Sequence, residues 1–136
     1  MSYELIEKNA NDTLSFGDFT LNEKKKVSDF EFDGAKYKVK TYNELTRLEK
    51  NEIFAYESEP GSRVENYKAI GDTIEFNVKA GEDVQITLGV EADSEYEVTV
   101  SGEKLGKMAT NISGKLVLSI EMKNPDAGVD VKVVKC

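Results

Sequence analysis

Apolar and polar residues alternate along most of the chain after residue 72. In the stretch 73–80 the even-numbered positions are apolar, and the odd-numbered positions are threonine, glutamate, asparagine and lysine. The alternation returns in four later stretches, 84–90, 96–100, 116–122 and 129–133. A period of two predicts antiparallel strands with one face in a core and the other toward solvent. We therefore expect Phe76, Leu88 and Ile120 to be core residues.

Residues typical of turns separate these strands, including Ser101-Gly102, Ser113-Gly114 and the stretch 124–128. A weaker strand is expected over residues 105–109. Short strands that recur roughly every 8–12 residues are typical of a β-sandwich. The pattern therefore predicts an immunoglobulin-like β-sandwich domain over residues 67–136.

The first half of the chain is less regular but also rich in strand signals. Asp33-Gly34 separates two alternating stretches and predicts a hairpin with a type I′ turn. A turn at Lys50-Asn51 is expected to join two further strands, the second over residues 53–56. A short helix over residues 42–48 is the alternative there, since Thr41 and Glu44 have capping-box spacing. Short strands are also expected over 3–7 and 14–21.

A change in composition marks the junction of the two parts. Ten of the twelve aromatic residues precede residue 70, and Glu59-Pro60-Gly61-Ser62 reads as a turn or linker. The fold class predicted is therefore all-β, with the sandwich preceded by a smaller β-rich segment over residues 1–66. Such a short segment cannot bury all its aromatic residues alone. We expect some of them to pack on the sandwich and some on a neighbouring protomer.

Charge narrows the range of partners. The chain has 18 Lys and Arg against 26 Asp and Glu, a formal net charge of −8. Binding to nucleic acid or to anionic membranes needs clustered positive charge, so neither partner is expected. No apolar run reaches the length of a spanning helix, and the polar, acidic start is unlike a secretory leader. A cytoplasmic location is the default expectation, with release as part of a larger assembly left open.

Missing residue types exclude many chemistries. The chain has no histidine, no tryptophan and one cysteine. Histidine-based nucleophilic catalysis and zinc sites therefore lack their side chains, and an intrachain disulfide is impossible. We predict a non-enzymatic protein without catalytic residues, cofactor or bound metal.

Two acidic stretches and one basic stretch are candidate sites. Glu91, Asp93 and Glu95 are spaced by two, either as a solvated turn or as a functional acidic site. Residues 124–130 have the oxygen density of a weak calcium loop but lack EF-hand spacing, so an ordinary turn is preferred. The lysines at 24–26 have acidic neighbours and read as a solvated loop rather than a phosphate site.

Aromatic residues and the terminal cysteine complete the candidates. Core packing is preferred over a sugar-stacking platform for four aromatic residues of the first half, Phe30, Phe32, Tyr37 and Phe54. Cys136 reads as a free terminal thiol, with an intermolecular disulfide as the alternative.

A family resemblance runs along most of the chain. The stretch 54–64 leads into Ile74-Glu75-Phe76, and then come the stretches 85–88, 96–98 and 114–116. Together these resemble small proteins of clostridial-type Firmicutes that carry the label endosialidase, which implies a carbohydrate-active or carbohydrate-binding role. The C-terminal half also resembles the immunoglobulin-like modules of bacterial enzymes and phage tail proteins. Sialidase-type sites use three arginines, whereas this chain has only Arg47 and Arg63.

These observations predict a non-catalytic interaction protein or a self-assembling structural protein. Edge strands of a sheet recruit further strands, so a homo-oligomer is the expected partner, formed through the N-terminal region. A carbohydrate-binding or carbohydrate-active protein is the alternative function. The identity of any glycan or other protein partner does not follow from the sequence.

Overall fold

The computed structural model describes residues 3–123 and 126–136, and these residues form thirteen β-strands and no helix. The strands are β1 Ile6–Lys8, β2 Leu14–Phe16, β3 Lys25–Phe32, β4 Ala35–Tyr42, β5 Leu45–Lys50, β6 Ile53–Glu59, β7 Arg63–Ile70, β8 Thr73–Lys79, β9 Val84–Gly89, β10 Glu95–Val100, β11 Glu103–Ala109, β12 Lys115–Ile120 and β13 Val129–Lys135.

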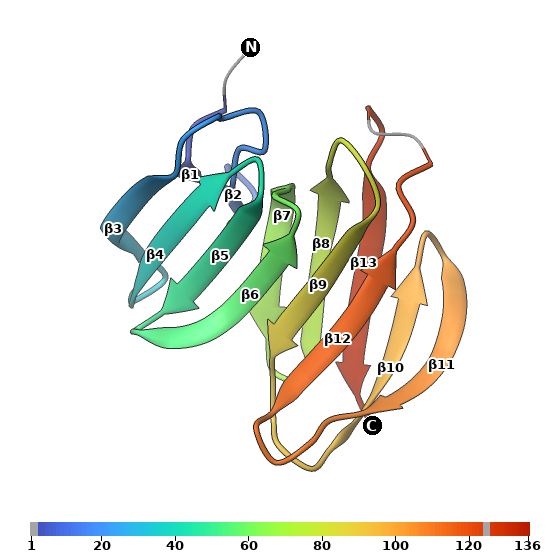
Figure 1. Cartoon of the computed structure of the whole chain (residues 1–136). Coiled ribbons are helices and arrows are strands. Elements are labelled where there is room, and N and C mark those ends of the chain that lie inside the picture. Colours follow the sequence, from blue (N-terminus) through green and yellow to red (C-terminus); the bar gives the residue numbers. More distant parts are fainter. Residues whose placement is uncertain (1–2, 124–125) are drawn as a thin grey trace.

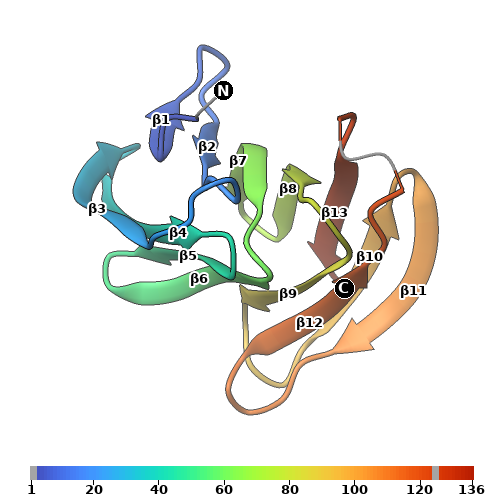
Figure 2. The same ribbon diagram turned by 45° about the horizontal axis from the view of Figure 1, so that its top comes forward.

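The strands make two antiparallel sheets that pack face to face (Figures 1 and 2). The seven-stranded sheet has the order β1-β2-β7-β8-β13-β10-β11, and the six-stranded sheet has the order β12-β9-β6-β5-β4-β3. This arrangement confirms the predicted fold class, an all-β sandwich with a β-rich N-terminal segment. The predicted weak strand at 105–109 is present as β11.

Tight turns explain several of the hairpins. Asp33 and Gly34 both have positive φ, 49° and 78°, between β3 and β4. Ser101 and Gly102 have φ of 50° and 80° between β10 and β11. Positive φ at both central residues is the geometry of a type I′ turn, whose twist matches that of the strands. The predicted hairpin at Asp33-Gly34 is confirmed.

Other local predictions need correction. The alternative helix at residues 42–48 is wrong, because β4 ends at Tyr42 and pairs with Leu45 at the start of β5. Thr46 and Leu48 both face the core, so the period of two prevails over the capping signal. The second turn lies at residues 51–52, one position later than expected.

The strand expected over 14–21 is shorter than predicted. It ends at Phe16 because Gly17 has a φ of 92° and lies against Ser62, where a Cβ atom would collide with the carbonyl oxygen. The strand expected over 3–7 starts later, at Ile6.

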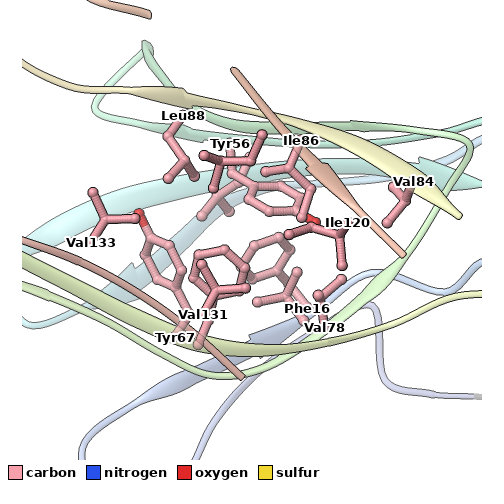
Figure 3. Close-up of a cluster of buried hydrophobic side chains, with 14 of the residues drawn as sticks. Phe16, Tyr56, Tyr67, Val78, Val84, Ile86, Leu88, Ile120, Val131 and Val133 are labelled. Atoms are coloured by element: carbon pink, nitrogen blue, oxygen red, sulfur yellow. The ribbon is translucent and has the colours of Figure 1, made fainter. Parts of the chain in front are cut away.

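One hydrophobic core lies between the two sheets and draws on both parts of the chain. The ring of Phe16 contacts that of Tyr56 edge to face at 5.3 Å, and Tyr56 contacts Phe76 at 5.7 Å. Figure 3 shows aromatic side chains meeting aliphatic ones of the opposite sheet. Phe76, Leu88 and Ile120 are at most 4% exposed, which confirms their predicted place in the core.

The division predicted at residues 66 and 67 falls inside strand β7. Both sheets continue across it, since β2 pairs with β7 and β6 pairs with β9. The stretch 59–62 is a packed turn rather than a linker, because Gly61 and Ser62 are buried and the Gly61 amide donates to the Asn43 carbonyl over 3.0 Å. The expectation that N-terminal aromatic residues pack on the sandwich is confirmed.

Candidate functional site

Four strands lie at sheet edges, and three of them carry features that discourage pairing with another chain. Strand β1 has three residues; β3 has a bulge, a positive φ at Asp29 and two lysines. Strand β11 is bulged opposite Val98 and has a φ of 104° at Gly106. Short length, bulges and edge lysines are the usual protection against edge-to-edge association. Strand β12 is the exception.

Strand β12 is a regular edge strand of six residues. Its register with β9 is unbroken from Lys115–Gly89 to Ile120–Val84, and it contains no proline and no positive φ. Within the part of the chain described here, β9 is its one sheet neighbour. Leu116, Leu118 and Ile120 are buried, whereas the residues between them are exposed, Val117 by 51%.

The backbone of β12 leaves polar groups along this free edge. The Val90 amide donates to the Gly114 carbonyl over 2.7 Å. In an antiparallel ladder, successive residues direct their N–H and C=O groups alternately toward the neighbour and away from it. The groups of Leu116, Leu118 and Ile120 therefore face β9, and those of the residues between them face outward. This row of free donors and acceptors, with Lys115, Val117, Ser119 and the following Glu121, is named the β12 edge.

An aromatic residue on β6, two strands in from β12, contacts two cations on the outer face of the same sheet. The Phe54 ring has the Arg47 guanidinium at 5.2 Å and the Lys115 ammonium at 5.1 Å from its centroid. Gly89 lies against Phe54 and leaves no room for a side chain. Rings and arginines of this kind are enriched where proteins bind one another.

The outward position of Phe54 corrects the prediction that it belongs to the core. Strands β5 and β6 shift register so that Leu48 pairs with Tyr56 but Glu49 pairs with Phe54. One extra residue in a strand reverses the faces of all residues beyond it. Of the other three aromatic candidates, Tyr37 is buried, and Phe30 and Phe32 pack partly buried against the core, as predicted.

A buried polar cluster joins the turn after β6 to strands β4 and β5. The Tyr56 hydroxyl lies 2.8 Å from Ser62 Oγ, and Ser58 Oγ lies 2.7 Å from the same atom. The Thr46 hydroxyl donates to the Ser62 carbonyl over 2.9 Å. Burial raises the pKa of Tyr56 well above its usual value, and the hydrogen bonds to Ser62 and Ser58 offset this only in part. Each member has a partner inside the protein, so the cluster is structural.

Arg63 is the largest fully buried side chain, and it holds residues 3–17 in place. Its Nη1 donates to the carbonyls of Glu4 at 2.6 Å and Gly17 at 3.2 Å, and its Nη2 lies 3.0 Å from Glu7 Oε1. The Tyr3 ring stacks against the guanidinium at 4.7 Å. Sequence reasoning missed this role, because neighbouring Val64 is also buried and an alternating strand places only one of them inside.

The acidic stretch around Glu91 forms a turn with its own partners. Glu91 Oε2 lies 2.8 Å from Lys135 Nζ, and this contact raises the pKa of Lys135. The Glu91 amide donates to the Tyr96 hydroxyl, and Asp93 has a positive φ. No group of three or more acidic or sulfur side chains in the described ranges is placed to hold a metal ion.

The other sequence candidates lie apart from the β12 edge. The lysine run enters strand β3 at Lys25, at the opposite edge of the six-stranded sheet. Residues 124 and 125 of the candidate calcium loop lie outside the described residues, and Asp130 accepts a hydrogen bond from Asn77 Nδ2. Cys136 is an exposed free thiol.

A polar groove of about 630 Å³ crosses the outer face of the seven-stranded sheet. Its lining includes the amides of Asn11, Asn66 and Asn77 and the charged pair Glu75 and Lys132, which lie 3.6 Å apart. Its one aromatic lining residue is Phe76, which is 4% exposed. The groove offers hydrogen bonds but no ring for stacking on a sugar.

Comparison with known proteins gives no relative. No family model matches the chain, and neither a curated protein nor a solved structure is significantly similar to it. The resemblance to the proteins labelled endosialidase therefore stays a prediction.

No helix long and apolar enough to cross a lipid bilayer occurs in residues 3–123 and 126–136.

Proposed function

We propose that this chain is a non-catalytic interaction protein that assembles with other protein chains through the β12 edge. The observation that carries the proposal is one unprotected strand edge in a sandwich whose three other edges are short, bulged or lysine-rich. A free edge with alternating side chains supplies main-chain hydrogen bonds to an added strand. Phe54 on β6 and Arg47 on β5 lie on the outer face of the same sheet and extend the surface that a partner can cover.

The non-catalytic part of the proposal rests on composition and on the placement of the charged residues. The chain has no histidine, and the acidic stretch at Glu91 is engaged by Lys135. The Arg63 guanidinium is engaged by residues 3–17, including the Glu4 carbonyl. The Arg47 guanidinium lies 3.2 Å from a carboxylate oxygen of Glu49 and 3.2 Å from one of Glu57.

The β12 edge takes the place of the N-terminal region as the proposed surface of assembly. Phe16 and Tyr56, two aromatic residues of the region 1–66, are buried within the protein's own core. Strand β3, the long edge strand of that region, has the bulge and lysines that hinder pairing. Assembly through the N-terminal region is the competing prediction that the experiment must separate.

Val117→Pro tests the proposal. The Val117 amide points away from β9, so proline removes a donor from the free edge and leaves the ladder to β9 intact. Light scattering at high micromolar concentration should show an assembly for the wild-type chain and a monomer for Val117→Pro. Val117→Thr is the matched control, since it keeps the amide and the β-branched shape and should still assemble.

Two results would contradict the proposal. A wild-type chain that is monomeric in both low and moderate salt has no self-assembly to explain. If the Val117→Pro variant has the same unfolding transition as the wild type and still assembles, the contact lies elsewhere. The N-terminal region is then the next candidate.

Carbohydrate binding is the second candidate function, and the polar groove supports it. Three side-chain amides beside a carboxylate and an ammonium group suit the hydroxyl groups of a sugar. Without an exposed ring in the groove, the expected affinity is low. A glycan array with the wild-type chain and Asn77→Ala would test it, and equal signals from the two proteins would exclude this groove.

A further inference from the structure

We propose that the strand added at the β12 edge is β12 of a second copy of this chain, antiparallel and related by a two-fold axis at Leu118. The two six-stranded sheets would then join into one continuous sheet. This inference rests on the proposed function, and it adds the partner, the direction and the register of the contact.

The backbone limits the registers in which two copies can pair. Within the ladder, Lys115, Val117 and Ser119 direct their main-chain groups outward. The same alternation, continued one step past Ile120, adds Glu121, so these four residues must face one another. With the axis at Leu118, Val117 lies opposite Ser119 of the second copy. Every outward residue of one strand then has an outward residue of the other strand opposite it.

Charge selects this register among those that the backbone allows. An axis at Leu118 places Lys115 opposite Glu121 of the second copy, once on each side of the axis. An axis at Val117 would place Lys115 opposite Ser119 instead and lose both ion pairs. Parallel pairing in register would bring Lys115 beside Lys115 and Glu121 beside Glu121. Opposite charges across two strands stabilise a pairing, and like charges destabilise it.

The exposed side chains fit the same arrangement. Val117 is 51% exposed on the outer face, and a strand laid beside it would cover part of this apolar surface. The Lys115 ammonium group lies over Phe54, on the side of β12 away from the second strand, and because Lys115 is exposed its side chain can turn toward Glu121 of the second copy when the pair forms.

The two-fold contact ends in a closed dimer rather than a filament. An isologous contact uses the same surface on both copies, so each β12 edge is consumed when the pair forms. The edges that remain are β1, β3 and β11, which are short, bulged or lysine-rich. Among the described strands, no second free edge of the β12 kind is left to propagate the sheet.

Charge reversal at the two ends of the strand tests the inference. Lys115→Glu alone sets two glutamates opposite each other, and Glu121→Lys alone sets two lysines opposite each other. Each variant should dimerise roughly tenfold more weakly, or worse, in sedimentation experiments at low salt. A mixture of the two variants restores both opposite pairs, and it should form a heterodimer about as tight as the wild-type dimer. The double variant Lys115→Glu, Glu121→Lys should also recover.

Lys107→Glu on β11 is the control with the same change in net charge. Its dimer should be as tight as that of the wild type, and circular dichroism should show the same fold for all variants. If Lys107→Glu weakens the dimer equally, net charge rather than register is responsible, and the inference is wrong.

The outcomes separate this inference from the proposed function. If Val117→Pro abolishes assembly but the mixed charge variants do not recover, the β12 edge is used with another partner strand or register, and only the inference fails. If Val117→Pro has no effect on assembly, both the inference and the proposed function are wrong.

Discussion

At the β1–β3 end of the sandwich, the edge strands of the two sheets contact each other, whereas at the β11–β12 end strand β12 leaves a regular edge free. The first end contains the buried Arg63 and the hydroxyl cluster around Ser62, with partners inside the chain. The second end contains aliphatic core residues such as Leu118 directly behind exposed backbone groups.

The two ends differ in how their polar groups obtain hydrogen-bond partners. Backbone and side-chain polar groups need hydrogen-bond partners wherever water is excluded. At the β1–β3 end, which we call the closed end, the carbonyls of Glu4 and Gly17 accept hydrogen bonds from the Arg63 guanidinium. At the β11–β12 end, which we call the open end, the outward backbone groups of β12 are exposed to water, which can serve as their hydrogen-bond partner. The closed end thus contributes stability, and the open end is the part that we propose for binding.

Removal of the N-terminal segment is expected to have the largest effect. A fragment of residues 67–136 loses β6, the partner of β9, and loses Phe16 and Tyr56 from the core. It should therefore lack a cooperative thermal transition, followed by circular dichroism. A fragment that unfolds cooperatively would show that the open end is an independent domain, as the sequence predicted.

Arg63→Met should cost about 3 kcal/mol of unfolding free energy, because it leaves buried carbonyl acceptors without their charged donor. Denaturant unfolding measures the change. Arg47→Met is the matched control, since the Arg47 side chain is 39% exposed and its ion pairs should contribute less than about 1 kcal/mol. Equal losses from the two variants would mean that the closed end does not depend on Arg63.

Large-to-small substitutions should distinguish the buried core positions from the outward face of strand β12. Leu88→Ala, Phe76→Ala and Ile120→Ala should each cost roughly 2–5 kcal/mol, since these side chains are buried. Val117→Ala should change the unfolding free energy of the monomer by less than about 0.5 kcal/mol. A large loss at Val117 alone would show that the faces of β12 are reversed.

Alkaline pH should weaken the fold through its buried tyrosines. Burial raises the pKa of Tyr56 and Tyr67 above the ordinary value of 10.0, so the unfolded chain releases these protons first. The stability that comes from their burial is complete below pH 10 and falls as the pH rises beyond it. Ultraviolet titration should show that both tyrosines ionise only with unfolding, and early ionisation of all six would contradict this.

Cys136→Ser should have the smallest effect. The thiol is free and exposed, and the Cys136 amide, which is kept in the variant, donates to the Glu95 carbonyl over 2.9 Å. The melting temperature and the assembly state should both stay unchanged. Loss of the assembly in this variant, or in reducing agent, would assign it to an intermolecular disulfide rather than to the β12 edge.

Local pattern was sufficient for most strands and for the inward faces of the C-terminal half. Alternation at Phe76, Leu88 and Ile120 identified core positions because a strand's two faces are set by its own residues. The type I′ turn at Asp33-Gly34 was equally readable, since it depends on two adjacent residues.

Tertiary structure alone decided which edges are paired and which polar residues are buried. Phe54 faces outward because of a register shift against β5, and Arg63 is buried because residues 3–17 close over it. Strand β12 is free because its place at the end of the sheet order leaves β9 as its single neighbour among the strands of residues 3–123 and 126–136. These properties depend on contacts between residues far apart in the chain, which a local pattern of apolar and polar positions does not contain.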